Sequence, residues 1–483
     1  MNLGTSLHWV SKKMKEKVCI IEGEKEVSYK ELWDNIELLA DSFLKIGIKE
    51  NDRVAIMLPN SSEFIYSFYA LSRISAVSVP LNIYLTSHEL KKIFNDCNPK
   101  FIITIDSLYK KKISSLIKGS LKVIFVDECE GKDKKSYTFN ELFKLGKPDN
   151  LPNISTSNKH IATINYTYRG LGEPLGAMLT HGNYHYGAMA YVRLTELVTA
   201  QRVLLITPMS HIFTLISCVI VSLLRGATVV IVKTFIPSHI FRTIEAKKID
   251  FMIAVPTVYM SLLKNYKKDK YDISSLKYGI AGGSSLSMEL YKSVKKDMGI
   301  ELFQGYGLTE TVPVTCNPRY KNKPASLGIP GHNMKVKVVD EKGNDIPPKK
   351  IGEIVVGGPS VMKGYLNREK ENKEFLKDGW FYTGDWGWVD EEGYIYFEGW
   401  KKDIVKVGGY NVDINEIKDT IRSFKGVKDI ELDIIKDDLW GNLIEARVDI
   451  KAKNDSTEKD IRAFCIDRLS PYKIPRKITV NKL

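Results

Sequence analysis

Hydrophobic residues in the first half of the chain recur with helical spacing in some segments and form short unbroken runs in others. From Leu32 to Ile46 they recur at three- and four-residue steps, which predicts an amphipathic helix. Ser28 and Glu31 have the spacing of a capping box at the start of this helix, and Gly47 follows its end.

The short apolar runs predict buried strands. Helical segments separate them, and one of these starts at a second capping box, Thr86–Glu89. Strands separated by helices favour a parallel or mixed sheet with helices on both faces. The runs are RVAIML at 53–58, AVSVPLN at 76–82, FIIT at 101–104, VIFVD at 123–127, and apolar stretches at 203–207, 228–232 and 251–254.

The pattern changes twice in the second half of the chain. After about residue 325, short strands joined by tight turns predict a β-rich subdomain. From Lys401 onward, short helices and strands alternate in a charged segment, which predicts a small α+β domain. We therefore expect an α/β protein with a large N-terminal domain of mixed or parallel sheets flanked by helices at 1–398, a hinge at 399–402, and a small, mobile C-terminal lid domain at 403–483.

Composition is that of an ordinary globular protein, with 43% hydrophobic and 27% charged residues. The net charge of +13 would suit an acidic partner, but acidic residues are interspersed with the lysines and no nucleic-acid-binding motif is present, so we expect no nucleic-acid partner. The six cysteines form no CxxC pair, which indicates reduced thiols in a cytoplasmic protein rather than a zinc site or a disulfide framework.

The longest apolar run, IFTLISCVIVSLL at 212–224, is too short to cross a bilayer. It predicts a buried helix that precedes the strand ATVVIV. The first residues lack the apolar core of a signal peptide. We expect a cytoplasmic protein without a transmembrane segment, and peripheral contact with a membrane stays open.

The stretch YTYRGLGEPLGAM at 166–178 has the glycine spacing of a phosphate-binding loop. The backbone N–H groups of such loops reach phosphate oxygens where no side chain intervenes, as Gly170 and Gly172 would allow. Other positions in this stretch are bulky, and Leu175 stands where a lysine would help to bind phosphate. Arg169 could offer a forked donor to phosphate instead.

A set of motifs extends in order along most of the chain. They are LPNSSE at 58–63, PMSH at 208–211, PTVY at 256–259, GGSSL at 282–286, QGYGLTE at 304–310, YTGD at 382–385, GWKKDIVKVGGY at 399–410 and PYKIP at 471–475. In this order and spacing they resemble the acyl-activating (AMP-forming) enzymes, which include acyl-CoA synthetases, adenylation domains and luciferases.

The resemblance implies a reaction in two steps with ATP, Mg²⁺ and CoA. A carboxylate attacks the α-phosphate of ATP, which gives an acyl-adenylate and pyrophosphate. The small C-terminal domain then rotates, and a thiol takes the acyl group. Adenylation supplies a good leaving group, and cationic donors stabilise the charge on the transferring phosphate.

The same resemblance assigns nucleotide contacts to particular residues. Tyr306 would stack on adenine, with the backbone of Gly283 and Ser284 along the adenine edge, and Asp385 would accept the ribose hydroxyls. Further residues that would hold the nucleotide or CoA are Gln304, Gly305, Gly307, Arg169, Gly170, Gly172 and Lys406.

Catalytic roles follow in the same way. Thr309 would hydrogen-bond the α-phosphate, and Glu310 would hold Mg²⁺, which prefers oxygen ligands shared with phosphate. His211 would line the acyl pocket and gate the thiol. Lys402 falls at the hinge between the two domains.

The glycine pair 408–409 would let the pantetheine arm of CoA pass close to the backbone, because neither Gly408 nor Gly409 has a Cβ.

Three features depart from the pattern of the family. The phosphate loop lacks its usual hydroxyl residues and lysine, and Trp400 stands where an arginine is usual. The sequence ends at Leu483, before a segment in which the family carries a lysine that acts in adenylation. All three departures are expected to weaken adenylation, whereas nucleotide binding and thiol transfer are expected to survive.

Three functions therefore stay open. The first is an acid–CoA ligase for a fatty or other hydrophobic acid, because Ile212 and Phe213 follow His211 and no acidic residue is placed there to bind an amino group. The second is a catalytically impaired homologue that binds nucleotide or acyl groups. The third is a ligase that loads an acyl carrier protein, which the net charge of +13 would attract if that carrier were acidic.

Overall fold

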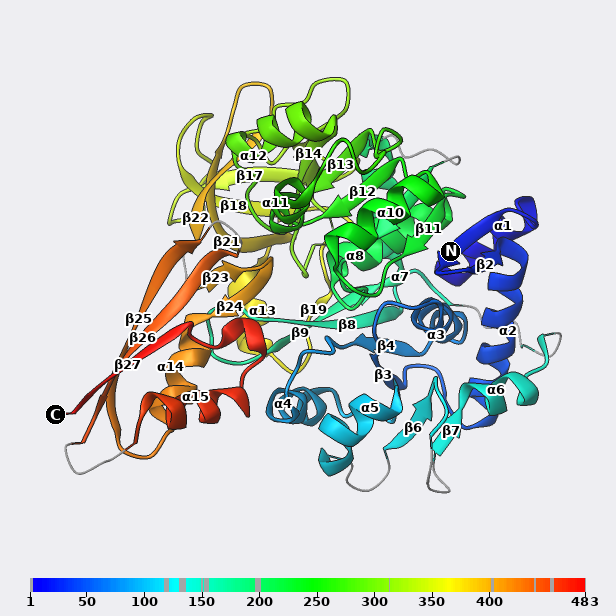
Figure 1. The fold of residues 1–483 in the computed structure, drawn as a ribbon, viewed down its shortest axis with the longest axis horizontal. Helices are drawn as coiled ribbons and strands as arrows, with labels where there is room; N and C mark the ends of the chain where they lie inside the picture. The colour runs from blue at the N-terminus through cyan, green and yellow to red at the C-terminus, as the bar shows by residue number, and fades with distance from the viewer. Residues whose placement is uncertain are drawn as a thin grey trace.

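The computed structural model describes residues 3–116, 121–129, 136–148, 151, 156–195, 201–311, 313–400, 404–437, 440–451 and 456–482. Two large sheets, a smaller β-rich layer and a C-terminal α+β unit make up the molecule (Figure 1). The chain begins beside α1 (Leu3–Lys13), and its end lies on the opposite side of the molecule, next to the C-terminal strands. This arrangement confirms the predicted fold class.

One large sheet mixes parallel and antiparallel strands and carries much of the candidate site. Its central strands pair in parallel, so that their carboxyl ends share one edge. The order across the sheet is β16 (Ile329–Pro330), β15 (Thr315–Cys316), β14 (Glu301–Tyr306), β13 (Tyr278–Ala281), β12 (Phe251–Ala254), β10 (Arg202–Leu205), β11 (Thr228–Ile231), β1 (Val18–Glu22) and β2 (Lys25–Ser28).

The second large sheet contains most of the strands that the first half of the sequence predicts. Its middle is parallel, and the antiparallel pair β8–β9 carries the phosphate loop between its strands. The order is β19 (Gly364–Tyr365), β9 (Leu175–Thr180), β8 (Ile161–Thr167), β4 (Val77–Pro80), β3 (Arg53–Met57), β5 (Phe101–Thr104), β6 (Lys122–Phe125) and β7 (Ser136–Thr138).

Local signals set the ends of the helices in this half. Helix α2 (Tyr29–Lys45) starts at the predicted capping box, where Ser28 and Glu31 bond to each other's backbone N–H, and α4 (Ser87–Cys97) starts at the second predicted box. The other helices in the first 200 residues are α3 (Ser62–Arg73), α5 (Asp106–Leu108), η1 (Tyr109–Ile113), η2 (Ser114–Leu116), α6 (Phe139–Leu145) and α7 (His181–Thr195).

The apolar run at 212–224 forms the buried helical segment that its sequence predicts, and strand β11 follows it. The segment is made of α8 (Ile212–Thr214), the π-helical turn η4 (Leu215–Ile220) and α9 (Val221–Leu224). Among the described residues, no helix is long and apolar enough to cross a membrane. The remaining helices of the large domain are α10 (Pro237–Lys247), α11 (Pro256–Asn265), α12 (Met288–Ser293), η5 (Val294–Met298) and α13 (Glu369–Phe375).

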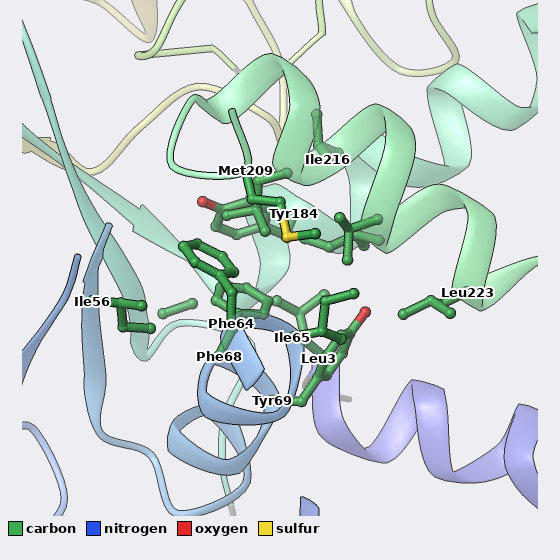
Figure 2. Close-up of a cluster of buried hydrophobic side chains, with 14 of the residues drawn as sticks. Leu3, Ile56, Phe64, Ile65, Phe68, Tyr69, Tyr184, Met209, Ile216 and Leu223 are labelled. Carbon is green, nitrogen blue, oxygen red and sulfur yellow. The ribbon is translucent and has the colours of Figure 1, made fainter. Parts of the chain in front are cut away.

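The main hydrophobic core lies between the two large sheets. Figure 2 shows Phe64, Phe68 and Tyr69 of α3 packed against side chains that include Met209 and Ile216 from the 209–224 region. These side chains are almost completely buried, and burial of each large apolar side chain contributes on the order of 2 kcal/mol to folding. The core therefore joins the two sheets into one scaffold.

The β-rich layer predicted after about residue 325 is present. Its strands pair antiparallel over a small core that includes Ile354, Val356 and Ile395. The strands are β17 (Lys335–Val339), β18 (Gly352–Gly357), β20 (Leu376–Lys377), β21 (Trp380–Val389) and β22 (Ile395–Trp400).

The C-terminal residues from Ile404 form the predicted α+β unit around a core of their own, which includes Ile417, Val448 and Ile461. The unit consists of the hairpin β23 (Ile404–Val407) and β24 (Tyr410–Asp413), helices α14 (Ile414–Arg422) and α15 (Glu458–Ile466), the short helix η6 (Pro471–Lys473), and a sheet of β25 (Val427–Asp437), β26 (Gly441–Ile450) and β27 (Lys477–Lys482). In Figure 1 it is drawn in orange to red, beside the second large sheet.

Candidate active site

One pocket lies where the loops that follow β8, β13 and β14 converge. Strands β13 and β14 are parallel neighbours, so the loops after their carboxyl ends, 283–285 and 307–310, lie on the same edge of the sheet. Ligands of open α/β sheets bind at this edge. The hairpin β23–β24 contributes Lys406 and Asn411 to the pocket lining, so the C-terminal unit completes the pocket.

The part of the pocket that we expect to hold a nucleoside, which we call the nucleoside end, is organised around a buried carboxylate. The hydroxyl of Tyr306 donates to Asp385 Oδ2 at 2.6 Å, and the backbone N–H of Asp385 donates to Thr383 Oγ1. Burial raises the pKa of Asp385, although the Tyr306 hydrogen bond and the positive charges of Arg169 and Lys406 oppose this effect. A fixed carboxylate beside an aromatic ring is suited to accept a pair of ribose hydroxyls.

The part that we expect to hold phosphate, which we call the phosphate end, contains a buried guanidinium. Arg169 lies between the rings of Phe375 and Phe381, at 4.9 and 5.2 Å, and its Nη2 donates to the carbonyl of Tyr382. Its Nε lies 3.7 Å from Glu310 Oε1 and is a buried donor without a hydrogen-bond partner. An unused donor that is buried next to a pocket is suited to bind an anionic ligand group.

Lys406 brings a second positive charge into the pocket. Burial lowers the pKa of Lys406, and the carboxylates of Asp385 and Glu310 act in the opposite direction. The pocket therefore combines two cationic and two anionic side chains in a site shielded from water, where electrostatic interactions are stronger than at the surface.

The residues present fit a magnesium ion that arrives with a nucleotide. Glu310 is almost completely buried, its Oε1 accepts the hydroxyl of Tyr365 at 2.6 Å, and Thr309 next to it also lines the pocket. Among the described residues, no group of three or more His, Cys, Asp or Glu side chains could hold a metal ion unaided. Phosphate oxygens would have to complete the metal's coordination shell, as Mg²⁺ sites on nucleotides commonly require.

The other end of the pocket is apolar. It is lined by Tyr191, Ile212, Phe213, Ile216, Leu308 and Pro313. His211 lies at its edge, where its Nδ1 accepts the backbone N–H of Phe213 at 3.3 Å. Burial lowers the pKa of His211 to about 4, and the charge of Lys406 adds to the effect, so the imidazole is neutral at neutral pH.

The structure brings many of the predicted residues together in this lining. These are Arg169, His211, Gly283, Ser284, Gly305, Tyr306, Gly307, Thr309, Glu310, Asp385 and Lys406. Their assignment to particular atoms of a ligand stays a prediction.

Other predicted residues lie behind the lining. The Gln304 side chain accepts the backbone N–H of Leu286, so it supports the loop after β13 from within the core. Gly170 and Gly172 face the C-terminal unit, where the backbone N–H of Gly172 donates to Asp413. Lys402 lies outside the described residues.

The glycine turn between β23 and β24 adopts left-handed backbone at both Gly408 and Gly409, with φ of 57° and 88°. A Cβ on Gly408 would lie 2.8 Å from the Trp440 ring, and one on Gly409 would lie 2.8 Å from Val255. This turn therefore requires glycine for its backbone and for its packing.

Two of the three departures from the family pattern, at Leu175 and Trp400, lie among the described residues. Leu175 is buried at the start of β9, in the core between the sheets, and it does not face the pocket. Trp400 does line the pocket, is 38% exposed, and lies with its ring centroid 4.9 Å from that of Phe397. A tryptophan here can stack on a ligand but offers no charge to phosphate.

Several site residues carry no signal in the sequence. Tyr365, Phe375 and Phe381 hold Glu310 and Arg169, yet they lie about 55 to 212 positions away along the chain and in no recognisable motif. Asn411 comes two residues after Gly409 and directly after the GWKKDIVKVGGY segment, so its position next to that motif is a usable signal.

Comparison with known proteins defines the class. Residues 7–366 match the family of AMP-binding enzymes. A long-chain-fatty-acid–CoA ligase of Bacillus subtilis (strain 168) is 32% identical, over 95% of this chain and 87% of that protein. A feruloyl-CoA synthase of an Amycolatopsis species is 29% identical, over 94% of this chain and 90% of that protein.

Solved structures agree with this class. An o-succinylbenzoate CoA synthetase from Bacillus subtilis, bound to a product analogue, superposes with a TM-score of 0.85 at 25% identity, over 99% of this chain and 94% of that one. A long-chain-fatty-acid–CoA ligase from Archaeoglobus fulgidus gives a TM-score of 0.82 at 26% identity, over 100% and 97%. The chain belongs to the AMP-binding enzyme family.

Proposed function

We propose that this protein activates a hydrophobic carboxylic acid as its acyl-adenylate and transfers the acyl group to CoA. As an AMP-forming acid–CoA ligase, it uses ATP, Mg²⁺ and CoA. The observation that carries the proposal is one pocket whose lining combines polar and apolar surfaces. The polar surface carries the Tyr306–Asp385 pair and two cations, and the apolar surface is formed by side chains such as Ile212 and Phe213.

The first step joins a ligand at the polar surface of the pocket to a ligand at the apolar surface. A carboxylate oxygen of the acid forms a bond to the α-phosphorus of ATP, and pyrophosphate leaves with the electron pair of the broken P–O bond. Arg169 would neutralise the charge that builds on the phosphate oxygens, and Thr309 would donate a hydrogen bond to them. Mg²⁺, held by Glu310, supplies further charge neutralisation when it is bound.

The second step uses the C-terminal unit. The CoA thiol gives its proton to solvent water, its sulfur bonds to the acyl carbon, and AMP leaves with the electron pair of the broken acyl C–O bond. Neutral His211 would line the path of the thiol, and the turn at Gly408 and Gly409 would let the pantetheine arm pass. In this proposal the large domain covers residues 1–398, the hinge 399–402 with Lys402, and the mobile unit 403–483.

The apolar end favours a fatty or aromatic acid over an amino acid. Ile212, Phe213 and Ile216 line it, and no acidic side chain among its described residues would pair with an ammonium group. We also propose a cytoplasmic location, which six free cysteines support, since five are buried thiols and the sixth is half-buried.

The test is AMP release by purified protein with ATP, Mg²⁺, CoA and a panel of acids that runs from short to long aliphatic chains and includes aromatic acids. We expect acid-dependent AMP and the matching acyl-CoA, with the highest kcat/KM for an apolar acid. A parallel assay with an acyl carrier protein in place of CoA identifies the acceptor. Folded protein that releases no AMP with any acid would overturn the proposal.

A specific observation favours the alternative of a protein that binds nucleotide or acyl groups without activating the acid. The Gly172 N–H donates to the Asp413 carboxylate and the lysine position holds the buried Leu175, so the loop presents little of the usual phosphate chemistry. Calorimetric binding of AMP or acyl-adenylate without turnover of ATP would support this alternative.

A further inference from the structure

A group of charged side chains is buried where the C-terminal unit meets the large domain. We call it the Lys473 cluster, which consists of Lys473, Glu89, Glu416 and Tyr168. The Nζ of Lys473 lies 2.6 Å from Glu89 Oε1, 2.8 Å from Glu416 Oε2 and 4.0 Å from the centroid of the Tyr168 ring. The side chains of the ion pairs are 0 to 3% exposed.

Because the cluster is buried, its ion pairs stabilise the contact only when all the charged partners are present. Ions lose their hydration when they are buried, and removal of one partner leaves the other charge uncompensated in a site without water. Glu89 is further fixed by the hydroxyl of Ser470, which donates to its Oε2 at 2.7 Å. Lys473 and Ser470 belong to the C-terminal unit and Glu89 lies in the first turn of helix α4, so the cluster joins segments more than 380 residues apart.

The phosphate loop is part of the same contact between the C-terminal unit and the large domain. Its Tyr168 covers Lys473, the Gly172 N–H donates to Asp413 Oδ2 at 2.9 Å, and the carbonyl of Gly170 accepts Asn415 Nδ2 at 3.2 Å. The other oxygen of Asp413 caps helix α14. In this arrangement the loop N–H that would serve a phosphate is bonded to the C-terminal unit.

These contacts with the phosphate loop and helix α4 determine which residues of the C-terminal unit reach the pocket. Asp413 is the last residue of β24, whose hairpin partner β23 carries Lys406 into the pocket lining. The turn of the same hairpin places Gly409 against Val255 at the loop after β12. Figure 1 shows β23 and β24 continuing into α14, on the side of the second large sheet where β9 lies.

We propose that Lys473 is a positioning residue for thiol transfer: through Glu89 and Tyr168 it seats the C-terminal unit on the large domain and its phosphate loop, which holds Lys406 and the glycine turn at the pocket. The inference rests on the proposed function. It implies that the phosphate loop has two alternating partners, the C-terminal unit and the phosphates of the nucleotide. Transfer therefore needs the cluster, and adenylation does not.

The two carboxylates of the cluster differ, which supplies a matched control. The charge of Lys473 and several hydrogen bonds outweigh burial and hold the pKa of Glu89 below its usual value. Burial, with the charge of Glu89 adding to it, raises the pKa of Glu416. Glu89→Gln removes the charge that joins the large domain to Lys473, whereas Glu416→Gln changes a contact within the C-terminal unit, because Glu416 lies on α14.

The test separates the two half-reactions. ATP–pyrophosphate exchange reports adenylation, and consumption of chemically prepared acyl-adenylate with CoA reports transfer. We expect Lys473→Met and Glu89→Gln to slow transfer at least about tenfold and to leave exchange within about threefold of wild type. Glu416→Gln should leave both rates within about threefold.

A double variant distinguishes positioning from a general loss of stability. Adding Glu89→Gln to Lys473→Met should slow transfer no further, because both changes break the same contact. Equal losses of exchange and transfer in Lys473→Met, or unchanged transfer, would overturn the proposal. Thermal melting of each variant establishes that it is folded.

Hydrogen exchange tests the cluster without any activity. Breaking the junction in Lys473→Met should speed exchange of amides at 168–176 and 404–413 at least about tenfold, and inorganic pyrophosphate should do the same in wild type by competing for the Gly172 N–H. Unchanged protection in both experiments would overturn the proposal. If wild type turns over no acid but these protection changes occur, the proposed function fails while the seating role of Lys473 stands.

Discussion

The nucleoside end and the phosphate end of the pocket are built in different ways. Asp385 and Tyr306 bond directly to each other, and Thr383 and Ile354 extend this network into the β-rich layer. At the phosphate end, Arg169 is held by two aromatic rings, and the loop that carries it is bonded to the C-terminal unit.

The phosphate end differs from a usual phosphate loop in which residues carry its positive charge. A loop of the usual type offers backbone N–H groups, hydroxyls and a mobile lysine to phosphate. Here the positive charges in the pocket are a buried guanidinium beside Glu310 and a lysine from the C-terminal hairpin, and the loop backbone is bonded to the C-terminal unit. The nucleoside end can thus follow the family pattern while the phosphate end relies on contacts that form only when distant segments meet.

The largest expected effect lies at the nucleoside end. Asp385→Ala should weaken ATP binding about 100-fold or more, because it removes charge-assisted hydrogen bonds to the ribose and leaves the Tyr306 hydroxyl without its acceptor. Titration calorimetry with ATP measures the change. In wild type, 2′-deoxy- and 3′-deoxy-ATP should bind more weakly than ATP, and the variant should no longer distinguish the three. Retained discrimination would show that Asp385 does not bind the ribose.

A change at the phosphate end should affect rate more than nucleoside affinity. Arg169→Thr should slow ATP–pyrophosphate exchange about 100-fold, the order of magnitude for loss of one donor to a transition-state oxyanion. Arg169→Lys keeps the charge but not the fork or the fit between Phe375 and Phe381, so it should lose about tenfold. Adenosine affinity is the control and should change less than about threefold. A loss of adenosine binding equal to the loss of rate would assign Arg169 a structural role only.

The same contrast explains what could be predicted from the sequence. Helix α2 and its capping box depend on residues within a few positions of one another, so the spacing of Ser28 and Glu31 was sufficient. The parallel strands and the buried segment at 212–224 follow from uninterrupted apolar runs. The π-helical turn inside that segment was not predictable, because it reflects packing rather than local propensity.

The residues of the site also differ in whether the sequence predicts them. Tyr306, Glu310 and Asp385 stand in motifs whose order is visible in the sequence, and the structure gathers them in one pocket. The rings around Arg169, and Glu89 as a partner of Lys473, lie more than 200 residues away along the chain, and neither hydropathy nor spacing marks these contacts. The glycines of the phosphate loop suggested phosphate contact, whereas the structure shows their backbone bonded to Asp413 and Asn415.

The smallest expected effect concerns His211, at the edge of the apolar end. Its pKa is lowered from 6.5 to about 4 by burial, so the folded protein binds fewer protons than the unfolded chain between these values. Stability from the neutral imidazole is complete above pH 6.5 and is lost as the pH falls toward 4. His211→Asn keeps a side chain of similar polarity without this ionisation, so between pH 7 and 4.5 its melting temperature should fall about 1–2 °C less than that of wild type.

Other histidines with lowered pKa values, such as His181, titrate in both proteins and cancel in the difference. Parallel melting curves across this range would mean that His211 is charged in the folded pocket, and the apolar end would then carry a third cation beside Arg169 and Lys406.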